Sequence, residues 1–231
     1  EAIEEVILRE GPDTVGALCL EPVTAGGGVI VPPPGYWERV MEICRKYDVL
    51  LHIDEVVCGV GRTGTWFGYQ HYGIEPDMLA IGKGIGNGYP VSVAVFGKES
   101  IQRLDSKPFK YTQSHQNDPL GAAVVNEVVQ VIEEQELIAE AARKGERFLS
   151  LLRDLVDGQK VLEVRGRGLM FAVDLASERL GTALYQQLIE QGFLVCNRGA
   201  LFRIDPPLIT SEEEFSAFIE VFSEILRTTD S

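Results

Sequence analysis

The fold of this chain is decided by two short stretches, VLLHIDE at residues 49–55 and MLAIGKG at residues 78–84. Each begins with apolar residues that do not alternate with polar ones, a pattern typical of strands buried on both faces of a parallel sheet. The sequence therefore predicts an α/β fold built on a mostly parallel sheet. The other elements expected in this part are strands at residues 15–20 and 91–96 and helices at residues 2–10 and 36–47.

The second part of the chain has a different pattern. Residues 118–156 have helical periodicity with a break near residues 135–137, and after Gly158 short apolar runs alternate with helical segments. We expect part of a large domain at residues 1–135, a connecting helix at 136–158 and a small α+β C-terminal domain at 159–231. The elements expected in this last segment are strands at residues 161–164, 169–175, 193–196 and 201–204 and helices at residues 177–191 and 211–227.

The composition limits the classes of function. The chain has 231 residues and a net charge of −14, which disfavours nucleic acid and anionic membrane surfaces as partners, because both attract a basic surface. No apolar run is long enough to span a bilayer. The four cysteines form no metal-ligand pattern, so no metal is expected, and a reduced, cytoplasmic setting fits them. Cys19 and Cys196 lie in apolar runs and are expected in the core.

Lys83 and Asp54 are the first candidates for chemistry, because functional residues of such sheets gather just past the carboxyl ends of strands. A partly desolvated lysine amine can form a Schiff base with a carbonyl, and the glycines after Lys83 leave room for a planar cofactor. A carboxylate at Asp54 suits the protonated nitrogen of a pyridine ring. An ordinary strand-end lysine and a carboxylate that caps backbone amides fit the same spacing. Glu55 fits a role in holding a loop.

Two other motifs compete with this interpretation. Residues 59–64 match the G-x-G-x-x-G pattern of dinucleotide-binding loops, but four residues separate them from Asp54, and residues 65–68 are a poor helix start. The stretch ending in Asp54 is also similar to the acidic strand of an NTPase, yet the chain has no G-x-x-x-x-G-K-[ST] phosphate loop. Both interpretations are therefore weak.

Arg203 is a candidate for binding an anion. It lies in an apolar run that continues into Asp205-Pro206-Pro207, and a lone arginine on such a strand needs an anionic partner. The partner is either a protein carboxylate, for which Asp205 and Asp174 are available, or the carboxylate of a substrate.

Taken together, six segments in order resemble the class III (fold-type I) pyridoxal-phosphate-dependent aminotransferases. The resemblance covers essentially the whole chain and explains the glycines of residues 59–64 without a dinucleotide. The segments are Leu20–Val23 with Gly27–Val29, Pro33–Tyr36, Asp54–Val56 with Gly59–Gly64, Pro76–Gly84, Asp118–Ala123 and Arg203–Leu208.

The resemblance implies a role for each of four residues. Lys83 would hold pyridoxal 5'-phosphate as a Schiff base and move a proton between the substrate and the cofactor, while Asp54 would pair with the pyridine nitrogen. Ser114 stands where the family usually has a threonine that reaches the cofactor phosphate of the neighbouring subunit. Arg203 would grip the substrate carboxylate. The implied function is transamination between an amine or amino acid and a 2-oxo acid, by a homodimer.

The sequence also departs from the family. Val57 stands where a glutamine usually lies near the ring oxygen of the cofactor. Gly26 stands where many ω-aminotransferases have a glutamate that shields the carboxylate-binding arginine, so Arg203 is expected to be ungated. Residues 114–120 resemble those of dialkylglycine decarboxylase, which makes a decarboxylating transaminase an alternative function.

The family's first half has no counterpart in this sequence. That half normally supplies the phosphate-binding loop, an aromatic ring that stacks on the cofactor and several strands of the sheet. Its absence is expected to leave an apolar edge and uncovered faces on the sheet. A further alternative is therefore a chain without independent activity, which acts as a folding or dimerisation module until the first half completes the site.

Overall fold

The computed structural model describes residues 1–105, 110–114 and 116–229. The chain forms two compact units, and neither unit is a continuous stretch of sequence. The first unit combines residues 1–22, 32–60 and 67–135. The second combines residues 23–31 and 61–66 with the chain from residue 136 onward.

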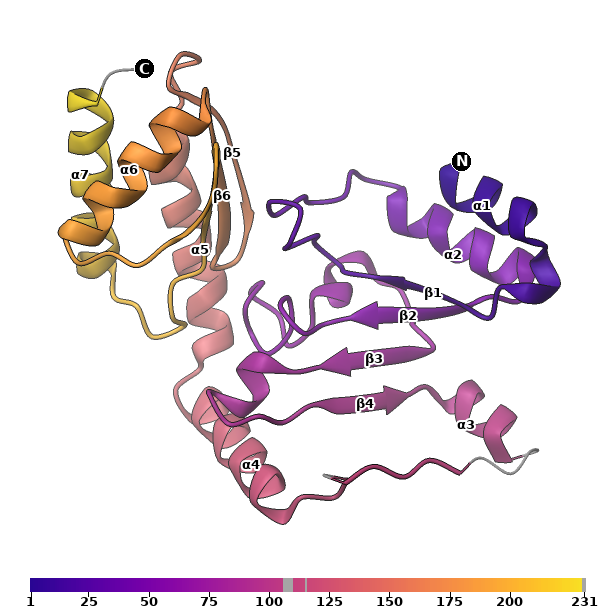
Figure 1. The fold of residues 1–231 in the computed structure, drawn as a ribbon. Coiled ribbons are helices and arrows are strands. Elements are labelled where there is room, and N and C mark those ends of the chain that lie inside the picture. The colour runs from indigo at the N-terminus through magenta and orange to yellow at the C-terminus, as the bar shows by residue number, and fades with distance from the viewer. Residues whose placement is uncertain (106–109, 115, 230–231) are drawn as a thin grey trace. The chain divides into compact units, whose positions relative to one another are not determined.

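The first unit is built on a sheet with the strand order β1-β2-β3-β4 (Figure 1). The first three strands are parallel and β4 is antiparallel to β3, which confirms the predicted α/β fold with a mostly parallel sheet. Asp54 of β2 is paired with Ala80 of β3, so the carboxyl ends of these two strands lie side by side at one end of the sheet. The strands are β1 (Ala17–Leu20), β2 (Leu50–Asp54), β3 (Met78–Ile81) and β4 (Val93–Phe96).

The two faces of this sheet differ in exposure. Leu51 and Ile53 are fully buried on one face, whereas Ala17 and Cys19 are exposed on the other. The apolar runs predicted strands buried on both faces, but within the described residues the cover of β1 is one-sided. The expectation that Cys19 and Cys196 lie in the core is therefore wrong, because Cys19 is exposed and Cys196 is only half-buried.

The helices of the first unit follow the predicted periodicity. An apolar cluster joins Ile7 of α1, Ile43 of α2 and Val49. Asp118 caps the start of α4: its side chain accepts hydrogen bonds from the backbone N–H groups of Leu120 and Gly121, so it satisfies donors that a helix start leaves unpaired. The helices are α1 (Ala2–Glu10), α2 (Tyr36–Tyr47), α4 (Pro119–Glu134) and the short α3 (Lys98–Asp105), which was not predicted, with the 3₁₀ helices η1 (Pro12–Thr14), η2 (Gly68–Tyr72) and η3 (Lys83–Gly86).

The second unit packs helices on an antiparallel sheet with the strand order β5-β6-β8-β7 (Figure 1). Its core is rich in aromatic rings: Phe148 of α5 stacks on Phe215 of α7 with ring centroids 3.8 Å apart, and Phe202 of β8 meets Phe222 of α7 edge to face. This arrangement is the predicted α+β pattern. The elements are β5 (Val161–Arg167), β6 (Met170–Leu175), β7 (Cys196–Arg198), β8 (Leu201–Ile204), α5 (Leu137–Arg153), α6 (Glu178–Glu190) and α7 (Glu212–Thr228).

Local sequence signals predicted most, but not all, of the ends of these helices and strands. Ser211 and Glu214 form a capping box at the start of α7, and the helix break falls at Glu136, which adopts a positive φ of 51°. The strand expected at residues 193–196 is wrong, because β7 begins only at Cys196. Within the described residues, no helix combines the length and apolar character needed to cross a bilayer.

Two segments from the first part of the sequence belong to the second unit. Arg165 of β5 donates from Nε to the carbonyl of Gly28, and Arg198 donates to the carbonyl of Gly26. The second segment lies against Gly168 so closely that a Cβ atom there would come within 2.3 Å of the backbone carbon of Thr63. These segments are therefore packed structural parts of the second unit.

Candidate active site

Asp54 is the last residue of β2 and lies half-buried. Its Oδ1 accepts a hydrogen bond from the backbone N–H of Val56 at 2.9 Å. Because Ile53 and Leu51 point to the buried face, Asp54 shares the opposite face with His52. The carboxylate therefore stands on the accessible face, at the carboxyl end of its strand.

Lys83 is exposed and begins the short helix η3, two residues after the end of β3. Its φ of 45° is left-handed, a conformation that is uncommon for a residue with a side chain and is often found at functional sites. Among the described residues, none accepts a hydrogen bond from its ammonium group. Lys83 thus offers a free amine at the same end of the sheet as Asp54, because β2 and β3 are parallel neighbours.

Glu55 holds the loop beside this site. Its side chain is fully buried, and its two oxygens accept hydrogen bonds from the backbone N–H groups of Gly68 and Tyr69, both at 2.9 Å. Burial raises the pKa of Glu55, the two amides oppose that rise, and the neighbouring charge of Asp54 adds to it. The suggestion that Glu55 holds a loop is confirmed.

A second contact steadies the chain that follows Lys83. The Tyr89 hydroxyl donates to Oδ2 of Asp118 at 2.7 Å, and this bond raises the pKa of Tyr89. The helix η3 also contacts α4. In the first turn of α4, a Cβ atom added at Gly121 would lie 3.5 Å from Cε1 of Tyr89. Sequence reasoning assigned Asp118 only as a helix start, since nothing local to Tyr89 reveals a partner 29 residues away.

Ser114 lies in an exposed turn before α4, in the first unit. Among the described residues, no hydrogen bond or ion pair involves its side chain. Its suggested role toward a phosphate group in a neighbouring subunit stays a prediction.

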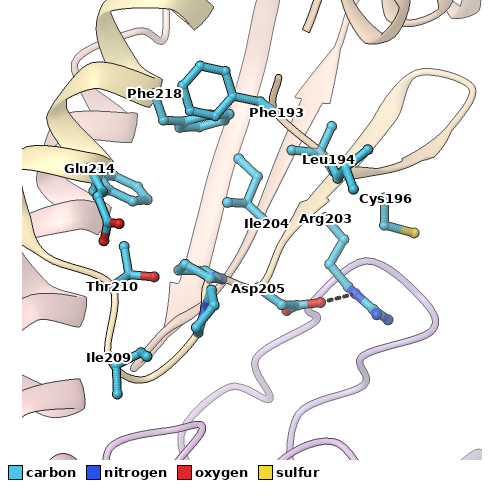
Figure 2. A pocket seen from close by; sticks show the side chains of 14 residues that line it. Phe193, Leu194, Cys196, Arg203, Ile204, Asp205, Ile209, Thr210, Glu214 and Phe218 are labelled. Atoms are coloured by element: carbon cyan, nitrogen blue, oxygen red, sulfur yellow. Dashed lines mark hydrogen bonds and ion pairs between the residues drawn. The ribbon is translucent and has the colours of Figure 1, made fainter. Parts of the chain in front are cut away.

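Arg203 belongs to β8 of the second unit and is paired with a protein carboxylate. Its Nε donates to Oδ2 of Asp205 at 2.5 Å, and both side chains are about three-quarters buried. Of the two carboxylates considered from the sequence, Asp205 is thus the partner, whereas Asp174 is bound by Arg165. The pair lines a pocket of about 550 Å³ (Figure 2). The rest of its lining is mainly apolar and includes Phe193, Leu194, Ile204, Ile209 and Phe218.

Arg62 is a half-buried cation that sequence reasoning did not single out within the glycine-rich motif. One terminal nitrogen of its guanidinium donates to the carbonyls of Leu169 and Pro206. Burial lowers the pKa of Arg62, the nearby charge of Asp205 opposes this, and that of Arg203 adds to it. Arg62 therefore supports the turn that follows Arg203.

No cluster of three or more histidine, cysteine, aspartate or glutamate side chains occurs in the part of the chain that the structure describes.

Comparison with known proteins places this geometry in a family. Residues 1–226 match the family model described as aminotransferase class-III. The chain is 44% identical to the taurine–pyruvate aminotransferase of Rhodobacter capsulatus, over 98% of this chain and 55% of that protein. It is 51% identical to the hypotaurine/taurine–pyruvate aminotransferase of Paracoccus denitrificans, over 78% of this chain and 41% of that protein.

Solved structures agree with this. A thermostable ω-transaminase mutant from Pseudomonas jessenii superposes with a TM-score of 0.93 at 34% identity, over 99% of this chain and 54% of that one. The Pseudomonas jessenii ω-transaminase in complex with PMP gives a TM-score of 0.92 at 34% identity, over 97% of this chain and 53% of that one. The chain spans about half the length of the relatives it matches.

Proposed function

This chain belongs to the class III aminotransferases, and we propose that the complete protein transfers an amino group from an acid-bearing amine to a 2-oxo acid. The observation that carries the proposal is the pair Asp54 and Lys83, a carboxylate and a free amine at the carboxyl ends of two neighbouring parallel strands. Family membership over residues 1–226 supports it.

The residues present fit pyridoxal phosphate, the cofactor of this family. Lys83 is exposed and without a hydrogen-bond acceptor among the described residues, so its amine is available to an aldehyde. Asp54 is half-buried, and among the described residues only Val56 donates a backbone hydrogen bond to its carboxylate, at Oδ1. When bound, the cofactor supplies a carbonyl for the amino group and a protonated ring that accepts electrons from the substrate carbon.

The proposed roles of the two residues follow from their chemistry. Lys83 would carry the proton to and from the carbon that bears the amino group, as a general base and then as a general acid. Asp54 would keep the ring nitrogen protonated, because an anion close to a cationic acid favours its charged form. Glu55 would hold the adjacent loop through Gly68 and Tyr69.

We propose a short ω-amino sulfonate such as taurine as the donor and pyruvate as the acceptor. The support is the 44% and 51% identity to taurine–pyruvate and hypotaurine/taurine–pyruvate aminotransferases. Arg203 would bind the acid group of the donor, because a guanidinium offers parallel N–H donors to an oxyanion.

The test uses the complete polypeptide, or this chain mixed with the upstream half of a relative. Addition of pyridoxal phosphate should produce a visible absorption band, and taurine with pyruvate should yield alanine. Lys83→Ala should abolish both signals, and the exposed Lys98→Ala should leave both intact. The proposal fails if the complete protein gives no cofactor band, or if Lys83→Ala retains alanine formation.

Two alternatives from the sequence have direct assays. A decarboxylating transaminase would release CO₂ from a dialkylated amino acid, whereas the proposed enzyme would release none from the same compound. A folding or dimerisation module would show no amine transfer by this chain alone, so amine transfer by the isolated chain would reject that alternative.

We also propose a cytoplasmic homodimer in which Ser114 contacts the cofactor phosphate of the partner subunit. Sedimentation would measure the dimer. Ser114→Ala should weaken cofactor binding, and Ser114→Thr, the residue that the family usually has, should preserve it.

A further inference from the structure

We propose that Asp205 is a positioning residue that fixes the guanidinium of Arg203 and thereby sets the preference for acid-bearing amines. This inference rests on the proposed function, because it concerns the group that would bind the acid of the donor. Its core observation is the short bond from Arg203 Nε to Asp205 Oδ2 at 2.5 Å.

The bond occupies only one side of the guanidinium. Asp205 engages Arg203 through Nε, and among the described residues no hydrogen-bond or ion-pair partner lies at the two terminal nitrogens. A guanidinium is planar, so fixing Nε also fixes the direction of the terminal N–H groups. Those groups form a fork that matches two oxygens of a carboxylate or a sulfonate.

Asp205 is itself held in place by the chain around it. Two prolines follow it, which restrict the backbone, and Arg62 donates to the carbonyl of Pro206. Further along the turn, the buried Lys144 donates to the carbonyls of Leu208 and Thr210, both at 2.9 Å. The carboxylate that orients Arg203 thus stands on a rigid turn and not on a mobile loop.

Asp205 does not neutralise the two arginines that lie near it. Arg62 and Arg203 lie close enough for each to feel the charge of the other, and both feel Asp205, so these three groups sum to one positive charge. The pocket has one more carboxylate in its lining, Glu214, which is exposed and accepts a hydrogen bond from the backbone N–H of Ser211. Oδ1 of Asp205 is buried and has no hydrogen-bond partner among the described residues. An unpaired buried oxygen is costly, and the charge of Arg62 offsets part of that cost. Asp205 therefore orients Arg203 without neutralising the cluster.

Figure 2 shows the Arg203–Asp205 pair in the lining of the pocket. The two side chains lie beside each other, and Phe193 and Phe218 line another part of the pocket. A guanidinium released from Asp205 would be free to change rotamer, because four rotatable bonds join it to the backbone. Loss of the carboxylate should therefore weaken binding of an acid group more than it changes the reactivity of the amine.

The experiment compares two donors in the complete, cofactor-loaded protein. The first half-reaction is followed by absorbance without any 2-oxo acid, so that the acceptor's own carboxylate does not contribute. The donors are taurine and propylamine, which have the same length and differ in the acid group. Asp205→Ala should raise the apparent Kd of taurine about tenfold and leave its maximal rate and the propylamine reaction nearly unchanged.

Two further variants separate positioning from charge and from folding. Asp205→Asn keeps a hydrogen-bond acceptor for Nε and should keep the apparent Kd of taurine within about threefold. In an Arg203→Ala background, Asp205→Ala should add no further loss, because the residue acts through Arg203. A tighter taurine complex in Asp205→Ala would overturn the proposal, since Asp205 would then be a competitor for Arg203. An equal loss for both donors would overturn it too, by showing a structural role.

A spectroscopic measurement makes the inference independent of activity. The Arg203 Nε–H proton, identified by its absence in Arg203→Lys, should exchange slowly with water in the wild type and in Asp205→Asn. It should exchange fast in Asp205→Ala. Slow exchange in Asp205→Ala contradicts the inference even if transamination is normal. A wild type that reacts with neither amine contradicts the proposed function, while the exchange measurement still tests Asp205.

Discussion

At the scale of single residues, two adjacent carboxylates take opposite environments. Asp54 lies half-exposed at the strand end with one backbone contact, whereas Glu55 is fully buried between two backbone amides. Alternation along the chain explains the difference, because successive residues at the end of a strand point to opposite faces. One carboxylate is therefore available to a ligand, and the other maintains the loop.

Replacement of Asp54 tests the first role. Asp54→Asn removes the charge that would keep the ring nitrogen protonated, and we expect amine transfer in the complete protein to fall roughly a hundredfold or more. The folded state should be little affected, because the amide oxygen of asparagine can still accept from Val56. The measurement is alanine formation from taurine and pyruvate, with the exposed Asp13→Asn as control. Unchanged activity in Asp54→Asn would remove Asp54 from the site.

Glu55 gives a prediction for pH. Burial raises its folded-state pKa above the unfolded value near 4.5, so the folded state binds the proton more tightly than the unfolded state. The contribution of Glu55 to stability is therefore fully present below the unfolded pKa and decreases as pH rises through the raised pKa. Urea unfolding of the wild type and of Glu55→Gln between about pH 4 and pH 8 should show the wild type losing ground relative to the variant. A wild type that gains stability relative to Glu55→Gln as the pH rises would contradict the assigned shift of the Glu55 pKa.

The candidate site could be predicted only in part from the sequence. Asp54 and Lys83 are recognisable because each follows an apolar strand, a local signal. Asp205 was only one of two possible partners for Arg203, and Arg62 gave no signal, because its bonds reach Leu169 and Pro206 across more than a hundred residues.

At the scale of elements, hydrophobic periodicity and helix caps predicted the bounds of an element well where both signals are present. α7 has both a capping box at Ser211 and an apolar stripe, and it was placed within one residue at each end. The strand β7 was misplaced, because the apolar residues 193–195 are coil while the polar Asn197 and Arg198 pair with β8. Pairing across strands, and not local hydrophobicity, decides such a short edge strand.

A glycine in α5 tests how closely elements approach. Propensity alone favours alanine over glycine in a helix by about 1 kcal/mol. At Gly145, however, an added Cβ atom would lie 2.3 Å from the carbonyl oxygen of Gly168, and backbone cannot yield as a side chain can. We expect Gly145→Ala to lower the free energy of unfolding by about 3 kcal/mol.

The control for this prediction lies in the same helix. Ala139 of α5 is exposed, so Ala139→Gly should cost only the propensity difference of about 1 kcal/mol. Urea denaturation of both variants gives the comparison. A Gly145→Ala protein as stable as the wild type would mean that α5 and the turn at Gly168 can separate without cost.

At the scale of the whole molecule, the two units are interleaved in sequence. The sequence suggested consecutive segments, because hydrophobic patterns report local structure and carry no sign of distant contacts. The segments 23–31 and 61–66 are joined to the second unit by hydrogen bonds between residues far apart in the sequence. Arg165 donates to the carbonyl of Gly28, and Arg62 donates to the carbonyl of Leu169. Assignment of units from sequence patterns alone misses such segments.

This interleaving predicts that residues 136–231 do not form a stable domain on their own. Without segment 61–66, the carbonyls of Leu169 and Pro206 lose the guanidinium of Arg62, and Gly168 loses the backbone packed against it. Buried carbonyls without donors are costly. A polypeptide of residues 136–231 should therefore show circular dichroism of helices and strands but unfold without a cooperative transition and bind a hydrophobic dye. In the intact chain, Arg62→Met should reproduce part of this loss, about 3 kcal/mol, and Arg62→Lys less. Cooperative unfolding of residues 136–231 at the free energy measured for the intact chain would show that the two segments are dispensable.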